Sequence, residues 1–301
     1  MCVIGRTYGR GLESYARIRC YIWLMVILRE VRMSINIVVC IKQIIDPEIP
    51  PEQFKVDPAS KRQIRGGLSL VISPYDQNAL EIALQLKEKL GGNITALCLG
   101  APEAQGAVRG AMGMGVNAGV LVSDPPLLDS DVFGVAHILA KAIQKLGMPD
   151  LVLTGCVSGD TGHKAVGPLL AQELVCPCVT FVSRVEAAAE GAVWLRKRVE
   201  DGYERVEAPL PLVATIVSDD SNVPRYSKLK DIMAATKKPI PIWKAIDLDL
   251  DPTRVGASAA RAQLCELVIP KQESKCEFIP GDTPEEQGEQ LAIRLRQLKA
   301  L

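Results

Sequence analysis

The residues best placed to do chemistry in this sequence lie in one stretch, 151–180. It begins with a short apolar run at 151–153, continues through a glycine-rich loop at 155–162, and then enters an apolar helical pattern that includes Pro168. A buried strand, a glycine loop and a helix N-terminus together form an anion site, because free amides and the positive end of the helix dipole face the same point. The stretch favours a bound phosphate. An ordinary strand-to-helix turn has the same composition, so both interpretations stay open.

The polar side chains in and beside this loop suit binding better than bond breaking. Ser158, Asp160 and Thr161 lie in the loop, and His163 follows it. Asp160 suits a ligand hydroxyl or turns the loop through its own backbone. The other histidine, His137, falls inside an expected helix, and neither histidine has a nucleophile and an acid placed for a catalytic triad. The motifs GxSxG, HExxH and GK[ST] are absent as well. We therefore expect no catalytic residues and a binding or carrier role.

Composition excludes several other classes of protein. The 301 residues carry 35 Lys and Arg against 35 Asp and Glu, whereas a nucleic-acid-binding domain has a basic excess. Four Phe and three Trp are too few for a base-stacking platform. The nine cysteines are scattered and odd in number, which is typical of reduced thiols in a cytoplasmic protein. Cys176 and Cys178 form C-P-C without a second pair, so we expect no metal site.

The elements that must position the glycine loop alternate between strands and helices. Apolar runs rich in β-formers predict strands at 35–41, 94–99, 120–122 and 151–153. Helices are expected to begin at Ser73 and Ser130, each with a capping hydroxyl, and a third ends at Met114. This alternation predicts an α/β fold in which helices flank a parallel sheet.

Ligands of such sheets bind at the carboxyl ends of the strands. The loops after Val39, Leu99 and Thr154 are therefore expected to line one crevice, and Ser73 heads a helix on the same side.

The pattern changes after Thr180. Two strand-like segments, 193–199 and 203–208, are joined through Glu200-Asp201-Gly202, which indicates a β-hairpin. The remaining expected elements are a strand at 212–217, a short helix at 228–236, an irregular charged arm at 247–282 and an amphipathic helix at 285–298. A terminal helix after a long arm either docks on another protein or packs on its own domain, and the sequence leaves both alternatives open.

Residues 1–32 differ from the rest of the chain. They carry six Arg, two Glu and a short apolar run at 21–28. That run is too short to span a bilayer, and charges follow it where the small residues of a signal-peptide cleavage site would lie. We expect Met33 to be the initiator and 1–32 to be an upstream extension outside the fold. A nucleotide-binding domain at 33–240 and a C-terminal arm with its helix at 241–301 would follow.

From residue 33 onward the chain resembles the small (beta) subunit of the electron-transfer flavoproteins. The resembling stretches are VVCIKQIID (38–46), SPYDQNALEIALQLK (73–87), SGDTGHKAVGPLLAQEL (158–174), RVEDGYERVEAPLPLVAT (198–215) and NVPRYSKLKDIMAATKKP (222–239). The fourth stretch lies in the family's signature region. Loop spacing and the tail are more similar to the anaerobic branch associated with nitrogen fixation or carnitine metabolism than to the fatty-acid-oxidation branch.

The resemblance implies a Rossmann-like, adenine nucleotide alpha hydrolase-like fold, related to universal stress proteins and N-type ATP pyrophosphatases. In the family this subunit forms a heterodimer with a larger alpha subunit that holds the electron-carrying FAD. Its own crevice holds AMP in simple carriers and a second FAD in electron-bifurcating members. Carried over by position, the implied ligand contacts are Cys40, Ser73, Leu99, Gly155, Cys156, Val157, Ser158, Gly159, Asp160, Thr161, Lys164, Ala165 and Val166.

The resemblance also implies surfaces for protein partners, which are the alpha subunit and then dehydrogenases or a quinone reductase. Tyr75 would lie near the subunit interface, and the loop with Asn222, Pro224, Arg225 and Tyr226 would engage partner dehydrogenases.

Two positions depart from the fatty-acid branch. Ser221 stands where that branch carries an anchoring leucine, so docking of an acyl-CoA dehydrogenase is not expected. Arg196 stands where the resemblance implies an acidic residue near the partner's flavin. Our hypothesis is that its charge raises the potential of that flavin if the side chain faces it, and the alternative is a solvated strand face.

Two other classes of protein compete with an electron-carrier subunit. An adenylating or pyrophosphatase-type enzyme on this fold would carry a serine- and glycine-rich loop after the first strand, where this chain has Cys40, Ile41, Lys42 and Gln43. A stand-alone nucleotide-binding protein of the universal stress type would leave the hairpin, the 222–226 loop and the terminal arm unexplained. We therefore predict a carrier subunit without membrane insertion and without nucleic-acid binding.

Overall fold

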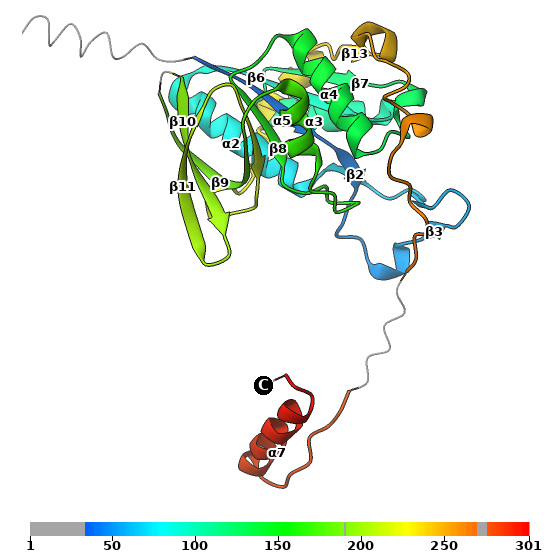
Figure 1. Ribbon diagram of the computed structural model, residues 1–301, viewed down its shortest axis with the longest axis vertical. Coiled ribbons are helices and arrows are strands. Elements are labelled where there is room, and N and C mark those ends of the chain that lie inside the picture. Colours follow the sequence, from blue (N-terminus) through cyan, green and yellow to red (C-terminus); the bar gives the residue numbers. More distant parts are fainter. Residues whose placement is uncertain (1–33, 190, 270–275, 301) are drawn as a thin grey trace, which may run out of the picture. The chain divides into compact units, whose positions relative to one another are not determined.

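The computed structural model describes residues 34–189, 191–269 and 276–300 (Figure 1). The described residues form two compact units, one made of 34–53 with 65–264, the other of 54–64 with the described part of 265–300. The expected extension 1–32 and the expected initiator Met33 lie outside the described residues.

The first unit is organised on a sheet with nine strands among the described residues, in the order β11-β10-β9-β12-β8-β1-β6-β7-β13. Their bounds are β1 (Ile35–Ile41), β6 (Gly92–Leu99), β7 (Ala118–Val122), β8 (Leu151–Gly155), β9 (Cys178–Ala189), β10 (Ala192–Val199), β11 (Gly202–Pro209), β12 (Leu212–Ile216) and β13 (Ile242–Trp243). In the part of this order that runs from β9 through β12, β8, β1, β6 and β7 to β13, every pair of neighbouring strands is parallel. Within this sheet, the pairs β9-β10 and β10-β11 are antiparallel. The predicted α/β class with a mostly parallel sheet is confirmed.

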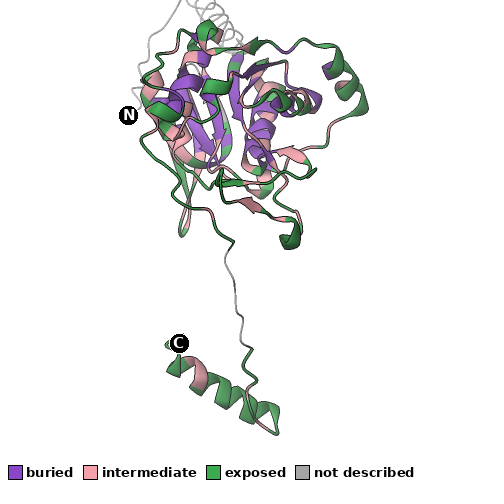
Figure 2. Cartoon of the chain, turned by 90° about the vertical axis from the view of Figure 1, so that its right-hand side faces the viewer, coloured by how far each residue is buried: buried purple, intermediate pink, exposed green. Residues whose placement is uncertain are grey.

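Among the described residues, five α-helices of the first unit pack with this sheet. They are α2 (Pro74–Leu90), α3 (Gln105–Met114), α4 (Val132–Leu146), α5 (Val166–Leu174) and α6 (Leu229–Lys237), and α2, α3, α4 and α5 are labelled in Figure 1. Side chains of β1 alternate between the two faces, so that Ile37 and Val39 pack in the core with α2 and α3, while Val38 and Cys40 pack in the core with α4 and α5. Figure 2 shows the buried strands and helix faces between the exposed outer surfaces. A strand buried on both faces reads as a continuous apolar run, which is why β1 and β8 were predictable.

Shorter elements complete the described chain. Strand β2 (Gln43–Ile45) pairs antiparallel with β5 (Leu70–Ile72), and the 3-10 turns are η1 (Pro51–Gln53), η2 (Pro102–Ala104), η3 (Pro125–Leu127), η4 (Asp220–Asn222), η5 (Ala245–Leu248) and η6 (Ala257–Ala259). In the second unit, β3 (Val56–Asp57) pairs with β4 (Arg62–Gln63), and α7 (Pro284–Gln297) begins at Thr283, whose hydroxyl accepts a hydrogen bond from the Glu286 amide.

One expected helix cap needs correction, and two strands were missed. The cap of α4 is Asp131 and not Ser130, because the Asp131 carboxylate accepts hydrogen bonds from the amides of Phe133 and Gly134. Strand β9, which begins at the last residue of the Cys-Pro-Cys segment, has a mixed apolar and polar sequence, and sequence reasoning missed it. Strand β13, which pairs with β7, was missed too. The expected domain boundary at residue 240 stays a prediction.

The order of the strands places a switch point beside β1. This strand lies between β6 and β8, and the helices that follow β1 and β8 in the chain, α2 and α5, belong to the cores on opposite faces of the sheet. In open α/β sheets, the crevice outside the carboxyl ends of strands at such a point is where ligands bind. The candidate site is therefore formed by the loops after β1 and β8.

Candidate functional site

The loops after β1 and β8 lie side by side because the two strands pair directly, with Val39 opposite Leu153. Leu99 ends β6 on the other side of β1, so the three loops predicted to share one crevice do emerge at the same edge. Cys40 and Cys156 are buried at this edge, and burial raises the pKa of both thiols, that of Cys156 to about 11. Both therefore remain protonated near neutral pH and are unsuited to nucleophilic chemistry.

A buried carboxylate that sequence reasoning did not single out as a site residue joins the two loops. Asp76, in the first turn of α2, accepts a hydrogen bond from the Lys42 amide at 2.8 Å through Oδ2 and from the Gly155 amide at 2.9 Å through Oδ1. Burial raises the pKa of Asp76 to about 7, although the two amide hydrogen bonds lower it. The available signal was an acid at the third position of the expected helix, a place where acidic side chains are common because they complement the helix dipole.

Ser73 also departs from its expected capping role. Its backbone occupies the cap position of α2, but its hydroxyl makes no capping hydrogen bond to the described helix. The hydroxyl instead accepts a hydrogen bond from the Gly159 amide at 3.3 Å, and the Ser73 amide donates to the Lys42 carbonyl. Ser73 is completely buried, and it fastens the glycine loop to the start of α2.

The glycine loop is held largely by its own polar groups. The hydroxyls of Ser158 and Thr161 lie 2.8 Å apart, and the Ser158 hydroxyl also accepts from the His163 amide. The carboxylate of Asp160 pairs with the Lys42 ammonium at 2.7 Å. These side chains give the loop a defined shape, and the Asp160–Lys42 pair closes it against the end of β1.

The N-terminus of α5 is open by contrast. Its cap residue, Ala165, has no side chain that can accept a hydrogen bond, and the amides of Lys164, Ala165 and Val166 have no acceptor within the part of the chain that the structure describes. Gly167 lets this end approach the sheet, because a Cβ there would lie 2.3 Å from Cγ2 of Thr215. Three amides and the positive end of the helix dipole thus face outward at the switch point.

The expected partner loop divides into buried and exposed parts. Asn222 is buried, and its side chain bonds to the carbonyls of Ser183 and Val217. Arg225 forms ion pairs with Glu81 and Glu88 of α2.

Other residues of this region remain available to a partner. Tyr226 is 98% exposed, and Leu229, which sequence reasoning did not select, is 74% exposed at the start of α6. Val223 and Met233 are exposed as well, whereas Ser221, Pro224 and Tyr75 are half-buried.

Arg196 lies on β10, where its charge already has an internal partner. Its guanidinium is 2.8 Å from the Asp219 carboxylate and stacks 4.4 Å from the ring centre of Tyr203. Burial raises the pKa of Asp219, but hydrogen bonds from Ser221 and Tyr203 and the charge of Arg196 outweigh it and leave the pKa lowered. Any influence of Arg196 on a flavin would act through this ion pair and not through an isolated cation.

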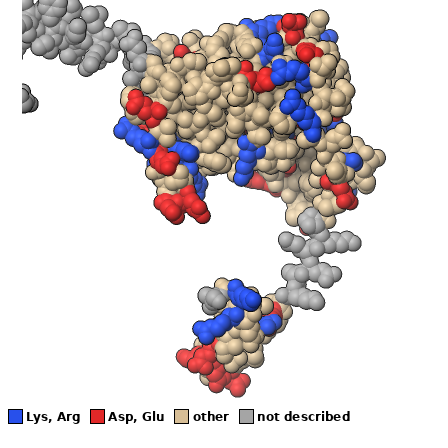
Figure 3. All heavy atoms as spheres, in the orientation of Figure 1, with Lys and Arg blue, Asp and Glu red and all other residues tan. Residues whose placement is uncertain are grey.

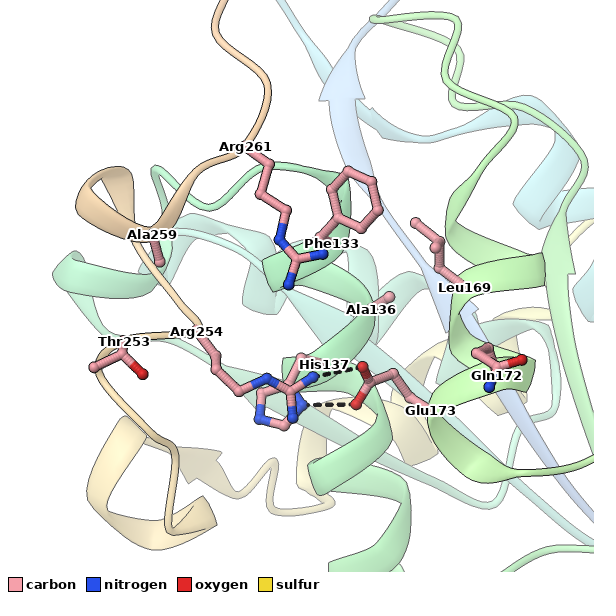
Figure 4. A pocket seen from close by; sticks show the side chains of 10 residues that line it. All are labelled: Phe133, Ala136, His137, Leu169, Gln172, Glu173, Thr253, Arg254, Ala259 and Arg261. Carbon is pink, nitrogen blue, oxygen red and sulfur yellow. Dashed lines mark hydrogen bonds and ion pairs between the residues drawn. The ribbon is translucent and has the colours of Figure 1, made fainter.

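A separate cavity of about 210 Å³ lies between α4, α5 and the segment 253–261 (Figure 4). Arg254 and His137 both point toward Glu173, with contacts of 2.6 and 2.8 Å to its two carboxylate oxygens. Arg261 stacks over Phe133 at the rim. The lining residues include none of the expected ligand contacts, and His137, which lies inside α4 as expected, is buried in this network.

The described residues contain no group of three or more His, Cys, Asp and Glu side chains arranged to hold a metal ion. None of their helices combines the length and the apolar character needed to cross a bilayer. Acidic and basic side chains are interspersed over the face drawn in Figure 3, in keeping with the zero formal charge.

The fold defines a class, that of α/β proteins with a mostly parallel sheet, and the open terminus of α5 lies at the switch point of this sheet. A family model described as Electron transfer flavoprotein domain matches residues 64–248, which is more than half of the chain. The chain belongs to the electron transfer flavoprotein family, and its relatives identify it with the beta subunits.

The relatives are similar to this chain over most of their length. Electron transfer flavoprotein subunit beta of Thermoanaerobacterium thermosaccharolyticum is 35% identical over 253 residues, covering 83% of this chain and 94% of the relative. Caffeyl-CoA reductase-Etf complex subunit CarD of Acetobacterium woodii is 34% identical, with 87% and 98% covered. Protein FixA of Azotobacter vinelandii is 32% identical, with 79% and 85% covered. These names support an electron-carrier subunit and give no support to a stand-alone stress-type protein.

Proposed function

We propose that the open N-terminus of α5 holds the phosphate of an adenine nucleotide. The amides of Lys164, Ala165 and Val166 would donate to it, because they lack other acceptors among the described residues. The helix dipole adds to the attraction. The observation that carries this proposal is the set of three amides without acceptors among the described residues, placed at the switch point of the sheet where ligands of such folds bind.

The rest of the expected contact set would shape the nucleotide's surroundings. The ends of β1, β6 and β8 would contribute Cys40, Leu99 and Cys156. The loop beside them consists of Val157, Ser158, Gly159, Asp160 and Thr161. Ser73 and Gly155 support that loop through contacts with α2. Ser73 and Gly155 would contribute to binding by holding the loop in one conformation before the nucleotide binds.

The nucleotide would be AMP in a simple carrier and a second FAD in an electron-bifurcating protein, with another FAD held by the alpha subunit. FAD supplies the redox chemistry when it is bound, accepting and releasing electrons. The side chains of this subunit bind and orient, since the buried thiols and the loop hydroxyls have no partner arrangement for bond breaking.

Two surfaces would meet other proteins. The exposed apolar side chains Val223, Tyr226, Leu229 and Met233 form a candidate docking surface for a dehydrogenase or quinone reductase, with Ser221, Asn222, Pro224 and Arg225 as its support. Tyr75 and the arm that ends in α7 would contact the alpha subunit. No residue of α7 is buried, and Leu291, Ile293 and Leu298 are exposed.

The test is to purify the full-length chain with a co-expressed alpha subunit and count flavins and adenine nucleotides per heterodimer. One flavin with one AMP indicates a simple carrier, and two flavins indicate a bifurcating one. A heterodimer without adenine nucleotide in this subunit would contradict the proposed site. For the docking surface, Tyr226→Ala and Leu229→Ala should slow electron transfer to a partner dehydrogenase, whereas Met148→Ala, an exposed apolar residue elsewhere in the first unit, should not.

A further inference from the structure

The carboxylate of Asp76 is the group that links both loops of the switch point to one helix. It accepts hydrogen bonds from the backbone amides of Lys42, just after β1, and Gly155, at the end of β8. The contact with Gly155 is close, because a Cβ on Gly155 would lie 2.5 Å from Oδ1 of Asp76. One buried side chain therefore holds an amide of each loop, in addition to the direct pairing of β1 with β8.

The same loops carry the groups expected to bind the nucleotide. Gly155 begins the segment that leads through the glycine loop to the open amides of α5. Lys42 pairs with Asp160 of that loop, and its amide is one of the two held by Asp76. A shift of either loop at Asp76 would move the glycine loop relative to the ends of β1 and β6.

A carboxylate in this position is costly to keep. Asp76 is buried, and desolvation of its charged form raises its pKa to about 7. The groups that act on it are Lys42, which favours the charged form, Asp160, which disfavours it, and the neighbouring thiols of Cys40, Cys98 and Cys156. Buried carboxylates with a strongly raised pKa are found preferentially at functional sites, which favours a role for Asp76 in the nucleotide site.

We propose that Asp76 is the positioning residue of the nucleotide site, holding the loops after β1 and β8 at the separation that a bound nucleotide requires. This inference rests on the proposed nucleotide-binding function. The ionised carboxylate can accept from both amides at once. A protonated carboxyl, or the amide of asparagine, has one accepting oxygen and one group that carries hydrogen, and so it releases one of the two loops.

The test uses full-length wild-type chain with its alpha subunit, stripped of nucleotide and equilibrated with AMP or FAD. At pH 8 we expect Asp76→Asn to bind AMP or FAD at least about tenfold more weakly than wild type. The loss of one hydrogen bond to a charged group is large enough to change affinity by this factor. At pH 6 the two proteins should bind alike, because the wild-type carboxyl is then protonated and resembles asparagine. Titration of the ligand's own phosphate affects both proteins equally and cancels in the ratio.

Asp150→Asn is the matched control. Asp150 joins the same two strands at their opposite ends, where its carboxylate accepts from the Asn36 amide at 2.8 Å. This variant should keep wild-type affinity at both pH values. Equal affinity of wild type and Asp76→Asn at pH 8 would overturn the positioning role. Failure of wild-type protein itself to bind AMP and FAD would instead refute the proposed nucleotide site.

Discussion

Helices α2 and α5 begin at the same edge of the sheet, but their N-termini are arranged in opposite ways. The start of α2 is closed, with the side chains of Ser73 and Asp76 bonded to loop amides and Ser73 completely buried. The start of α5 is open, with Ala165 at the cap and three amides without acceptors in the described chain.

This difference separates a structural helix terminus from one suited to a ligand. Both termini present the positive end of a helix dipole at this edge of the sheet. At α2, buried side chains bond to the neighbouring loops, whereas at α5 three amides lack acceptors among the described residues. A candidate binding terminus is thus recognised by free amides at the switch point and not by the preceding glycines alone.

The largest expected effect is the pH dependence of the free energy of unfolding that Asp76, at the start of α2, causes. The folded-state pKa of Asp76 is raised from 3.8 to about 7, so the folded protein keeps a proton that the unfolded chain has lost between these values. The contribution of Asp76 to stability is present at low pH and is lost as the pH rises toward 7. The free energy of unfolding of wild type relative to Asp76→Asn should fall by on the order of 2–4 kcal/mol from pH 4 to pH 8.

Urea unfolding of both proteins across this pH range measures the difference. Groups other than Asp76 titrate in both proteins and cancel, and Asp150→Asn serves as the reference for a carboxylate at the opposite edge of the same strands. A stability difference that stays constant with pH would show that Asp76 is ionised throughout and that burial does not disfavour its charge.

The next effect concerns the close approach of the open terminus to the sheet. In Gly167→Ala, the new Cβ would lie 2.3 Å from Cγ2 of Thr215 and 2.9 Å from Oγ1 of Thr154. We expect a loss of about 1–3 kcal/mol from this overpacking, measured by thermal unfolding. Gly106→Ala in α3 is the control, because its nearest atom is 3.6 Å away and alanine there should stabilise the helix by up to about 1 kcal/mol. Equal effects of the two changes would contradict the close contact at α5.

A smaller effect would follow from closing the open terminus. Ala165→Asp places a carboxylate beside the start of α5, where it complements the helix dipole and should raise stability by up to about 1 kcal/mol. The same negative charge would repel a phosphate held by the amides of Lys164, Ala165 and Val166, so AMP affinity should fall. Lys228→Asp is matched to it, since α6 also lacks a side-chain cap, and it should stabilise without changing AMP affinity. Unchanged AMP binding by Ala165→Asp would place the phosphate elsewhere.

The smallest effect is expected for the ion pair that closes the glycine loop. Lys42 and Asp160 are both partly exposed, and exposed ion pairs contribute little. Lys42→Met should therefore change the free energy of unfolding by less than about 0.5 kcal/mol, as measured in urea. A loss above about 1 kcal/mol would mean that the pair is better shielded from solvent than its exposure indicates.

Much of the fold was predictable from local pattern. Strands β1, β6, β7 and β8 are apolar runs of strand length, and α2 begins with Ser-Pro and ends at Gly91-Gly92, so each carries its own signal. Strand β9 carries a weaker one, because it pairs in parallel with β12 on one side and antiparallel with β10 on the other and mixes buried with exposed side chains. The two-residue strand β13 is defined by its pairing to β7 alone.

The sequence by itself determined the class of fold, the glycine loop before α5 and the family resemblance, because these depend on residue types at short spacing. The tertiary structure alone decided which polar groups meet. It joined Asp76 to Lys42 and Gly155, turned Ser73 toward Gly159 and paired Arg196 with Asp219. These partners are far apart in the chain, and a hydrogen bond depends on the positions of both atoms in space, which local sequence does not specify.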